Sequence, residues 1–368
     1  MKKIFIILFV CILIGPSIIW MGIKDYIKTE TTENRVLAEK PELALNNLEN
    51  FPSKYENYYN DHLPFKGQAV KLKSYMDYKL FNYIDSDKVL LGKRNWLFYR
   101  GNGINELPIN DYQGINYYSE EKKEKIKKNV QSVNNELKKK GIDFSIMICP
   151  NKEHIYHEYL PDTIFKVNKK CRADLLVEHL EKETNVPIIY PVQDLEEEKN
   201  NQLYYKYDTH WNRLGGFVGE QCIRRLYQGK YDSLGKQNIR IEQRNPVTDL
   251  ANMINLQSEF KDDKNFYVDD YKKNVVVEIR DFTENYYLKV YHSNAPDKRK
   301  VMVLRDSYGE AMMDYLAKDF RDVIFIHRDI FKKEDIETFQ PDIIIYQMVE
   351  RATDSMLQLE KKFGINKK

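Results

Sequence analysis

Amphipathic helices alternate with short apolar runs in this chain, and that alternation constrains its fold more than any other feature. Ser119 can cap a helix, and apolar residues then follow on one helical face from Ile126 to Leu137. The run Phe-Ser-Ile-Met-Ile-Cys at 144–149 comes next and ends at Pro150. A helix followed by a buried strand is typical of α/β proteins, in which helices cover both faces of a largely parallel sheet.

The same helix-and-strand unit recurs later in the chain. We expect further helices at 173–182, 214–226, 308–317 and 330–339, and further strands at 188–190, 300–304, 323–326 and 342–346. Together these elements predict a three-layer α/β/α domain. Residues 230–298 interrupt the pattern, because they are polar and contain strand-like runs at 274–280 and 286–292. We interpret them as a β-rich insertion that forms a lid or a substrate wall.

The N-terminal segment predicts a membrane anchor. Lys2 and Lys3 precede an uncharged stretch from Ile4 to Ile23, which is long enough to span a hydrocarbon core as a helix. The basic flank predicts a single-pass protein with a cytoplasmic N-terminus and an extracytoplasmic body. A cleaved signal peptide is the alternative. The bulky residues at 18–21 offer no small-residue cleavage site and favour an uncleaved anchor.

Four segments follow from these patterns. We expect a transmembrane anchor at 1–24, a membrane-proximal helical arm at 25–88, an α/β domain at 89–351 and a C-terminal tail at 352–368. The arm has helical apolar spacing from Phe51 to Leu63. The α/β domain opens with a hairpin at 89–99, whose turn lies at 92–95.

Charge and cysteine content exclude several classes of function. The chain has 58 basic and 56 acidic residues, a net charge of +2, so no excess of positive charge points to nucleic acid. Its four cysteines show no CxxC spacing, and His154, His157 and Glu158 do not have the HExxH spacing of zinc proteases. From sequence we therefore predict no metal and no cofactor.

Ser307 is the first residue whose position suggests chemistry. It follows the strand at 300–304, and a helix begins directly after it. In an open α/β sheet ligands bind at this carboxyl edge, and the helix N-terminus supplies N–H groups for a developing oxyanion. A serine that only caps the helix is the alternative.

Asp208 and His210 supply the partners that a serine nucleophile needs. They lie two residues apart in the segment Asp-Thr-His-Trp, before a helix. A carboxylate that is so near in sequence can fix the tautomer of the imidazole and stabilise its cation, while Trp211 shields the ring from water. In the alternative reading Asp208 or Thr209 caps the helix and His210 is a surface residue. We predict a triad in which Ser307 is the nucleophile, His210 the base and Asp208 the orienting acid.

Other polar residues are expected near the same edge. Asn151 and Lys152 follow the strand at 144–149, although a simple turn after Pro150 explains them equally well. Further candidates flank Ser307 or follow the strand at 342–346. The full set of predicted substrate or oxyanion contacts is Arg305, Tyr308, Gln347, Arg351, Asn151, Lys152 and Trp211.

Several motifs together carry a family resemblance. They are Asp-Thr-His-Trp at 208–211, Asp-Ser at 306–307, Cys-Pro-Asn-Lys-Glu-His-Ile-Tyr at 149–156 with Tyr-Leu-Pro at 159–161, Gly-x3-Trp-Leu-Phe-Tyr at 92–99 and Glu-Asn-Arg-Val-Leu at 33–37. Over residues 33–351 the chain resembles the alginate O-acetyltransferase AlgJ/AlgX family and its DHHW relatives, which are SGNH-hydrolase-like. The resemblance implies the same roles for Ser307, His210 and Asp208.

The order of the elements predicts a circular permutation of the SGNH fold. SGNH enzymes begin with the nucleophile strand and end with the Asp/His loop, whereas Ser307 comes late in this chain. A cyclic reading from the strand at 300–304 restores the usual order. The Gly and Asn blocks of the superfamily lack their usual form, so we expect the backbone amide of Ser307 to be the main oxyanion donor.

Three functions are compatible with this reading. The resemblance implies an O-acetyltransferase that acts on a polysaccharide and receives acetyl groups from a polytopic membrane O-acyltransferase. An acetyl esterase would use the same triad with water as the acceptor. A non-catalytic polysaccharide-binding scaffold would not need Ser307.

Overall fold

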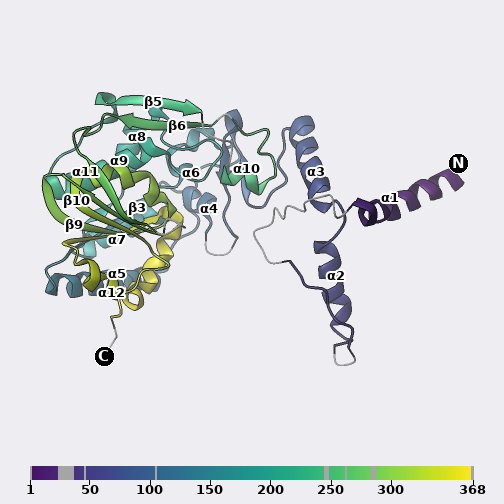
Figure 1. Ribbon diagram of the computed structural model, residues 1–368, viewed down its shortest axis with the longest axis horizontal. Coiled ribbons are helices and arrows are strands. Elements are labelled where there is room, and N and C mark those ends of the chain that lie inside the picture. The colour runs from purple at the N-terminus through teal and green to yellow at the C-terminus, as the bar shows by residue number, and fades with distance from the viewer. Residues whose placement is uncertain are drawn as a thin grey trace. The chain divides into compact units, whose positions relative to one another are not determined.

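The computed structural model describes residues 2–23, 37–44, 47–103, 106–243, 248–261, 263–282 and 287–365 (Figure 1). Most of the motif at 33–37 lies outside these residues. The chain divides into two compact units. The first comprises 1–86 and 251–259, and the second comprises 87–250 and 260–368.

The first unit contains three helices, α1 (Lys2–Ile23), α2 (Phe51–Asp61) and α3 (Lys66–Phe81). The helix expected at the N-terminus is confirmed. Its stretch Lys3–Trp20 has a mean hydropathy of 2.4 and is long and apolar enough to cross a membrane, a property that anchors share with signal sequences. Helices α2 and α3 have no buried residues among those described.

The second unit is built on a seven-stranded mixed sheet in the order β4-β3-β11-β9-β10-β8-β7. Neighbouring strands from β4 to β10 are parallel, and β8 and β7 add antiparallel strands at one edge. The five parallel strands are the ones that the sequence predicts. The strands are β3 (Asp143–Cys149), β4 (Ile188–Ile189), β7 (Val277–Phe282), β8 (Leu288–Ser293), β9 (Asp297–Arg305), β10 (Phe320–His327) and β11 (Ile343–Val349).

The strand order confirms the permuted SGNH-like topology. When the chain is read cyclically from β9, the strands follow as β9, β10, β11, β3 and β4. Their positions in the sheet then give the order 2-1-3-4-5, which is one of the two common doubly wound arrangements. Ligands in such sheets bind at the carboxyl ends of the strands, where the order reverses.

Helices cover both faces of the sheet (Figure 1). On β3, Ile146 and Ile148 point to one face, and Met147 and Cys149 to the other. The first face packs against α5 (Glu120–Lys139), α7 (Arg172–Glu183), α12 (Glu334–Phe339), a 3-10 helix at Glu350–Gln358 and α13 (Leu359–Lys362). The second packs against α8 (Val192–Glu198), α9 (Arg213–Gln228) and α11 (Met313–Asp319).

Helix α5 shows why these elements form where the sequence indicates. The Ser119 hydroxyl accepts a hydrogen bond from the Lys122 N–H, which satisfies one of the free donors of the first turn. Ile126, Val130, Val133 and Leu137 form its buried face. The segment expected as a tail packs on this helix: Met356, Leu359 and Phe363 are buried in the same cluster.

The expected β-rich insertion divides into two parts. One hairpin, β7–β8, pairs with β10 and extends the central sheet. The other part is a separate antiparallel pair, β5 (Asn238–Gln243) and β6 (Lys264–Asp269). The hairpin predicted at 89–99 is confirmed as β1 (Val89–Leu91) and β2 (Leu97–Tyr99). The remaining elements are α4 (Pro108–Gln113), α6 (Lys152–Ile155), α10 (Asp249–Met253) and 3-10 turns at Lys93–Asn95, His157–Tyr159, Lys199–Asn201, Leu234–Lys236 and Ser307–Met312.

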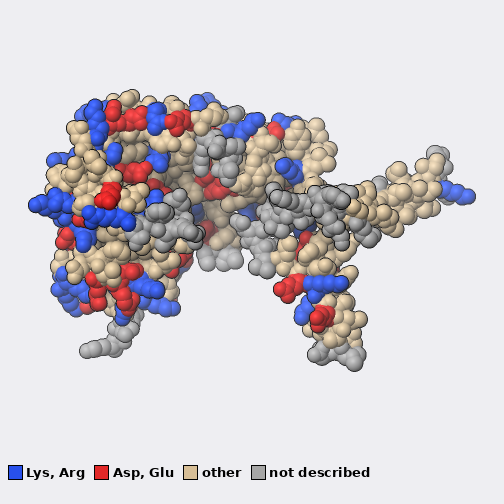
Figure 2. Space-filling model, in the orientation of Figure 1, with Lys and Arg blue, Asp and Glu red and all other residues tan. Residues whose placement is uncertain are grey.

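Charges of both signs are interspersed on the surface of the second unit. Figure 2 shows Lys and Arg beside Asp and Glu over the face in view. Exposed pairs of this kind, such as Lys170 with Glu178, contribute little to stability. The fold therefore rests on its two apolar layers.

Gly216 of α9 permits a close approach to the 3-10 turn at 307–312. A Cβ at this position would lie 2.4 Å from the carbonyl oxygen of Ala311 and 2.6 Å from its Cβ. We expect Gly216→Ala to lower the free energy of unfolding by about 1–3 kcal/mol, because α9 and the turn must separate. Urea denaturation measures this effect. Gly235→Ala, where a Cβ meets open space, is the control and should stay within about 0.5 kcal/mol of wild type.

Candidate active site

Ser307 lies at the carboxyl edge of the sheet, immediately after β9. Asp306 caps the turn, because its Oδ1 accepts a hydrogen bond of 3.0 Å from the Tyr308 N–H. Ser307 is exposed, whereas Asp306 and Tyr308 are buried. The predicted helix after Ser307 begins as a 3-10 turn and continues as α11. The first N–H groups of such a turn have no intrahelical partner and can stabilise an oxyanion.

The structure brings Ser307, His210 and Asp208 together from segments about one hundred residues apart. His210 Nε2 lies 2.8 Å from Ser307 Oγ, and His210 Nδ1 lies 2.6 Å from Asp208 Oδ1. Asp208 Oδ1 also accepts the backbone N–H of His210, at 3.0 Å. Because the carboxylate accepts the proton on Nδ1, Nε2 carries the lone pair and can accept the serine proton.

A second carboxylate, Asp249, stands beside this pair. Its Oδ1 accepts the Thr209 N–H at 2.8 Å, its Oδ2 accepts the Thr209 hydroxyl, and Oδ2 lies 3.8 Å from His210 Nδ1. Burial, followed by repulsion from Asp208, raises the pKa of Asp249. Sequence reasoning missed this residue, because it lies in a polar stretch about forty positions downstream with no local pattern.

The environment of His210 favours its protonated form. Burial alone would lower the pKa of the imidazole. The hydrogen bond that His210 donates to Asp208 and the negative charges of Asp208 and Asp249 outweigh burial, so the net pKa is raised. These carboxylates therefore stabilise the imidazolium that forms when His210 takes a proton from a nucleophile.

Lys152 braces the loop that carries Asp208. Its Nζ donates to the carbonyl oxygens of Asp208 at 2.7 Å, Tyr205 at 3.2 Å and Lys206 at 3.3 Å. The side chain is fully buried and its ammonium lies 5.2 Å from the centroid of the Phe98 ring. Burial lowers the pKa of Lys152 to about 8. The sequence suggests a substrate contact, whereas the ammonium points at the backbone of the loop.

Replacing Lys152 tests this bracing role. We expect Lys152→Met to lower the free energy of unfolding by about 1–3 kcal/mol, because three carbonyl groups lose a shared donor in a buried site. Chemical denaturation gives this quantity. The control is Lys170→Met, at a lysine that pairs with Glu178 on the surface. Equal stability of both variants would contradict a bracing role.

Two predicted oxyanion candidates, Gln347 and Arg305, form hydrogen bonds with the turn that carries Ser307. Gln347 Oε1 accepts the Asp306 N–H at 3.0 Å, and its Nε2 donates to Asp306 Oδ1 at 2.9 Å. Arg305 donates to the carbonyl oxygen of Asp306 at 3.2 Å and to Glu310 at 3.0 Å. These hydrogen bonds hold the serine turn in place, and contact of either side chain with substrate stays a prediction.

Trp211 and Tyr308 connect the two loops of the site. The indole N–H of Trp211 donates to the Tyr308 carbonyl oxygen at 2.8 Å, and the Tyr308 hydroxyl donates to the Thr209 carbonyl oxygen. The Tyr308 ring centroid is 5.1 Å from that of His210. Both side chains are almost fully buried, which suits them to fixing the distance between His210 and Ser307.

Asn151 and Arg351 lie at the ends of β3 and β11, on the same rim. An Arg351 guanidinium N–H donates to Asn151 Oδ1 at 3.2 Å, and the guanidinium lies 5.6 Å from the Tyr308 ring. Asn151 is buried, and within the described part of the chain its Nδ2 has no hydrogen-bond partner. An amide donor of this kind stabilises an oxyanion where a substrate oxygen can reach it.

Comparison with protein families and with curated proteins gives consistent relatives. Residues 89–280 match a family described as SGNH hydrolase-like domain, acetyltransferase AlgX. This range includes Asp208 and His210, whereas Ser307 lies beyond it. Two proteins described as probable alginate O-acetylase AlgJ are 26% identical, over 173 residues in Pseudomonas syringae pv. tomato and over 181 in Pseudomonas fluorescens. These matches span 46% and 48% of this chain, but only 40% and 42% of the relatives' length.

Solved structures share the fold. PatB1 of Bacillus cereus aligns with a TM-score of 0.54 and 17% identity, over 74% of this chain and 99% of that one. A DHHW family protein from Eubacterium siraeum aligns with a TM-score of 0.50 and 16% identity, over 74% of this chain and 97% of that one. At this identity the likeness concerns the fold alone.

Proposed function

The chain belongs to the family described as SGNH hydrolase-like domain, acetyltransferase AlgX, and we propose that it is an acetyltransferase. In this proposal it transfers acetyl groups to polysaccharide hydroxyls through an acyl-enzyme on Ser307. The observation that carries this proposal is the hydrogen-bonded line from Ser307 Oγ through His210 to Asp208, with steps of 2.8 and 2.6 Å. The curated relatives are described as probable alginate O-acetylases, which supports a polysaccharide as the acceptor.

In the first half-reaction, Ser307 Oγ attacks the carbonyl carbon of an acetyl donor while His210 Nε2 takes the serine proton. Asp208 stabilises the imidazolium. The oxyanion accepts hydrogen bonds from the Ser307 N–H and from Asn151 Nδ2. The bond to the leaving group then breaks, His210 returns its proton to that group, and Ser307 is left acetylated.

In the second half-reaction, a sugar hydroxyl attacks the acetyl-serine carbonyl carbon. His210 takes the proton of the attacking hydroxyl and then gives it to Ser307 Oγ as the acyl bond breaks. The polymer leaves as an O-acetyl ester and the enzyme is regenerated. Exposure of Ser307 beside buried neighbours suits this step, because a hydroxyl on a long polymer can reach an exposed rim more easily than an enclosed cavity.

The N-terminal helix bears on where this reaction occurs. We propose that α1 is a single-pass anchor with a cytoplasmic N-terminus, and that residues 25–88 form an arm that joins it to the extracytoplasmic catalytic domain. Acetyl-CoA is absent outside the cell, so the donor must be supplied through the membrane. A polytopic membrane O-acyltransferase is the partner that we propose for this supply.

Whether the acetyl group is passed to a sugar hydroxyl or to water distinguishes a transferase from an esterase. The full-length chain in detergent is incubated with p-nitrophenyl acetate and a panel of oligosaccharides, and products are measured by mass spectrometry. We expect O-acetylated oligosaccharides, formed in proportion to acceptor concentration. If free acetate is the only product with every acceptor, the protein is an esterase. If acetyl-serine is not detected at all, a non-catalytic scaffold is favoured.

A further inference from the structure

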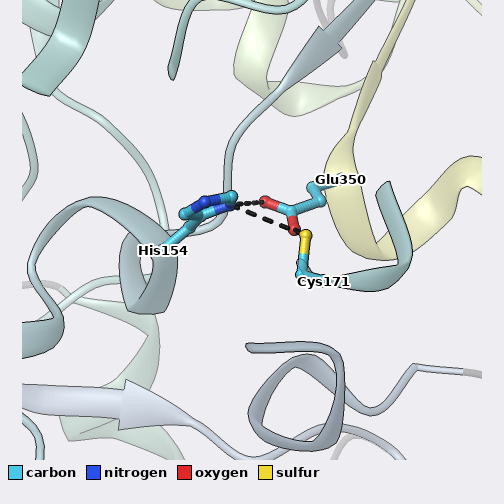
Figure 3. Close-up of side chains that lie close together, drawn as sticks. All are labelled: His154, Cys171 and Glu350. Carbon is cyan, nitrogen blue, oxygen red and sulfur yellow. Dashed lines mark hydrogen bonds and ion pairs between the residues drawn. The ribbon is translucent and has the colours of Figure 1, made fainter. Parts of the chain in front are cut away.

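A buried cluster of metal-ligand side chains adjoins the candidate active site. His154 comes from α6, Cys171 precedes α7, and Glu350 follows β11, so three segments distant in sequence meet (Figure 3). All three side chains are buried. Figure 3 shows the imidazole, the carboxylate and the sulfur directed at one another, and the mechanism above uses none of them.

The donor atoms lie close enough together to reach one ion, because one ligand atom from each of His154, Cys171 and Glu350 lies within 4.8 Å of the other two. Cys171 Sγ lies 3.3 Å from Glu350 Oε1 and 3.9 Å from His154 Nδ1, and His154 Nδ1 lies 3.4 Å from Glu350 Oε2. Zinc bonds of about 2.3 Å to sulfur and about 2.0–2.1 Å to nitrogen and oxygen place tetrahedral ligands roughly 3.3–3.6 Å apart. The two Glu350 separations involve different carboxylate oxygens, so binding through one oxygen requires the carboxylate to turn and Cys171 to move toward His154.

A hydrogen bond with Tyr190 accounts for only one of the three contacts at His154 Nδ1. Glu350 Oε2 at 3.4 Å, the Tyr190 hydroxyl at 3.1 Å and Cys171 Sγ at 3.9 Å all converge on its Nδ1. A ring nitrogen offers one N–H or one lone pair, so it can bond well to one of them. The separation from Glu350 also exceeds the roughly 2.7–2.9 Å of a charge-assisted bond. A cation at the centre would engage all of these atoms at once.

Charge balance favours a divalent ion of intermediate softness. Thiolate Cys171 and carboxylate Glu350 carry two negative charges, which neutralise a 2+ ion while His154 stays neutral. An apolar interior accepts such a neutral assembly, whereas it disfavours an isolated charge. A sulfur, nitrogen and oxygen ligand set is typical of zinc. Binding would displace the proton that the Cys171 thiol donates to Glu350.

We propose that His154, Cys171 and Glu350 bind Zn²⁺ through Nδ1, Sγ and a carboxylate oxygen. All three ligands are buried, which suits a structural ion. Glu350 also accepts the Asn151 N–H at 2.8 Å and precedes Arg351, so the ion fixes the rim on which both residues lie. Sequence spacing gave no hint of it, because the ligands are 17 and 179 positions apart.

Metal content tests the proposal. The full-length chain is stripped with a chelator, loaded with zinc chloride, desalted and measured by inductively coupled plasma mass spectrometry. We expect one zinc per chain in wild type. Cys171→Ala should weaken binding by more than about 100-fold, because loss of an outer-shell partner alone costs about 10–100-fold.

Two control variants locate the ion. Cys222→Ala removes another buried cysteine, whose thiol contacts Asp194, and should keep the zinc. His210→Ala should keep it as well, although Asp208, His210 and Asp249 form a second group with metal-ligand atoms close together. Zinc retained by Cys171→Ala, or lost from His210→Ala, overturns the proposal.

Cobalt substitution tests the ligand set in the wild-type protein, so its main readout does not depend on whether a variant folds. Co²⁺ bound through a thiolate shows ligand-to-metal charge-transfer absorption in the near ultraviolet. We expect this absorption in wild type, its loss in Cys171→Ala, and an altered visible spectrum in Glu350→Gln. Wild-type protein that binds Co²⁺ without thiolate absorption would contradict the proposed ligand set, whatever the acetyltransferase activity proves to be.

Discussion

Ser307→Ala is expected to lower kcat/KM for acetyl transfer by about 10⁴- to 10⁶-fold, because loss of a triad nucleophile leaves only substrate binding and oxyanion stabilisation. The fold should be unaffected, since Ser307 is exposed and its hydroxyl bonds to His210 at the surface of the site. The measurement is steady-state formation of acetylated oligosaccharide, together with the thermal unfolding midpoint of each variant.

A control variant at another serine that precedes a 3-10 helix distinguishes loss of the nucleophile from loss of a turn residue. Ser233 directly precedes the 3-10 helix at Leu234–Lys236, and its side chain makes no capping bond. Ser233→Ala should therefore retain wild-type activity. Mass spectrometry of wild type after a brief incubation with an acetyl ester should show one acetyl group on the peptide that contains Ser307. Full activity in Ser307→Ala would rule out the acyl-enzyme mechanism and favour a binding role.

The proximity of Ser307, His210 and Asp208 could be anticipated from sequence because each segment borders a recognisable element. Ser307 comes directly after a buried strand, and Asp208 and His210 come before a capped helix. A permuted reading then places both segments at one edge of a parallel sheet. The sheet order β4-β3-β11-β9-β10 provides that edge, so the separation of about one hundred residues along the chain does not keep them apart.

The supporting residues could not be derived in the same way, because their roles depend on the direction of a side chain. Lys152 follows β3 as predicted, but its ammonium points at the loop carbonyls. Gln347 is expected in a loop, whereas it lies within β11 and its amide bonds to Asp306. Asp249 reaches His210 through a loop whose path no local pattern specifies. Sequence periodicity reports which face a residue occupies, not which polar atom it meets there.

The same limit explains the differences at the edges of the fold. The alternating strands β7 and β8 read as a separate insertion, yet β10 offers an unpaired edge, and pairing with it satisfies the backbone groups of both. The segment after Arg351 reads as a polar tail. Three of its apolar residues, Met356, Leu359 and Phe363, are buried in the cluster that includes the apolar face of α5. Short amphipathic segments of this kind become ordered by the surface they cover.

Asp208→Asn should produce the second large effect, a loss of about 10⁴-fold in kcat. Asp208 Oδ1 lies 2.6 Å from His210 Nδ1 and accepts its proton. An asparagine amide can present its own N–H to Nδ1, which would favour the tautomer with the proton on Nε2. That tautomer cannot accept the proton of Ser307, and the imidazolium would lose the neighbouring negative charge that stabilises it.

The pH profile gives this prediction a specific signature. His210 must be neutral to act as a base, so kcat/KM rises with pH through its pKa, which lies above the ordinary value of about 6.5. Removing the charge of Asp208 lowers that pKa, so the acid limb of the residual activity should move to lower pH. Asp249 Oδ2 lies 3.8 Å from His210 Nδ1, whereas Asp208 Oδ1 lies 2.6 Å from it. Asp249→Asn should therefore move the acid limb in the same direction with a much smaller loss of kcat. The contradicting outcome is an Asp208→Asn variant whose kcat stays within about tenfold of wild type and whose acid limb in the kcat/KM profile does not move. Asp208 would then be a structural cap, and another group would activate His210.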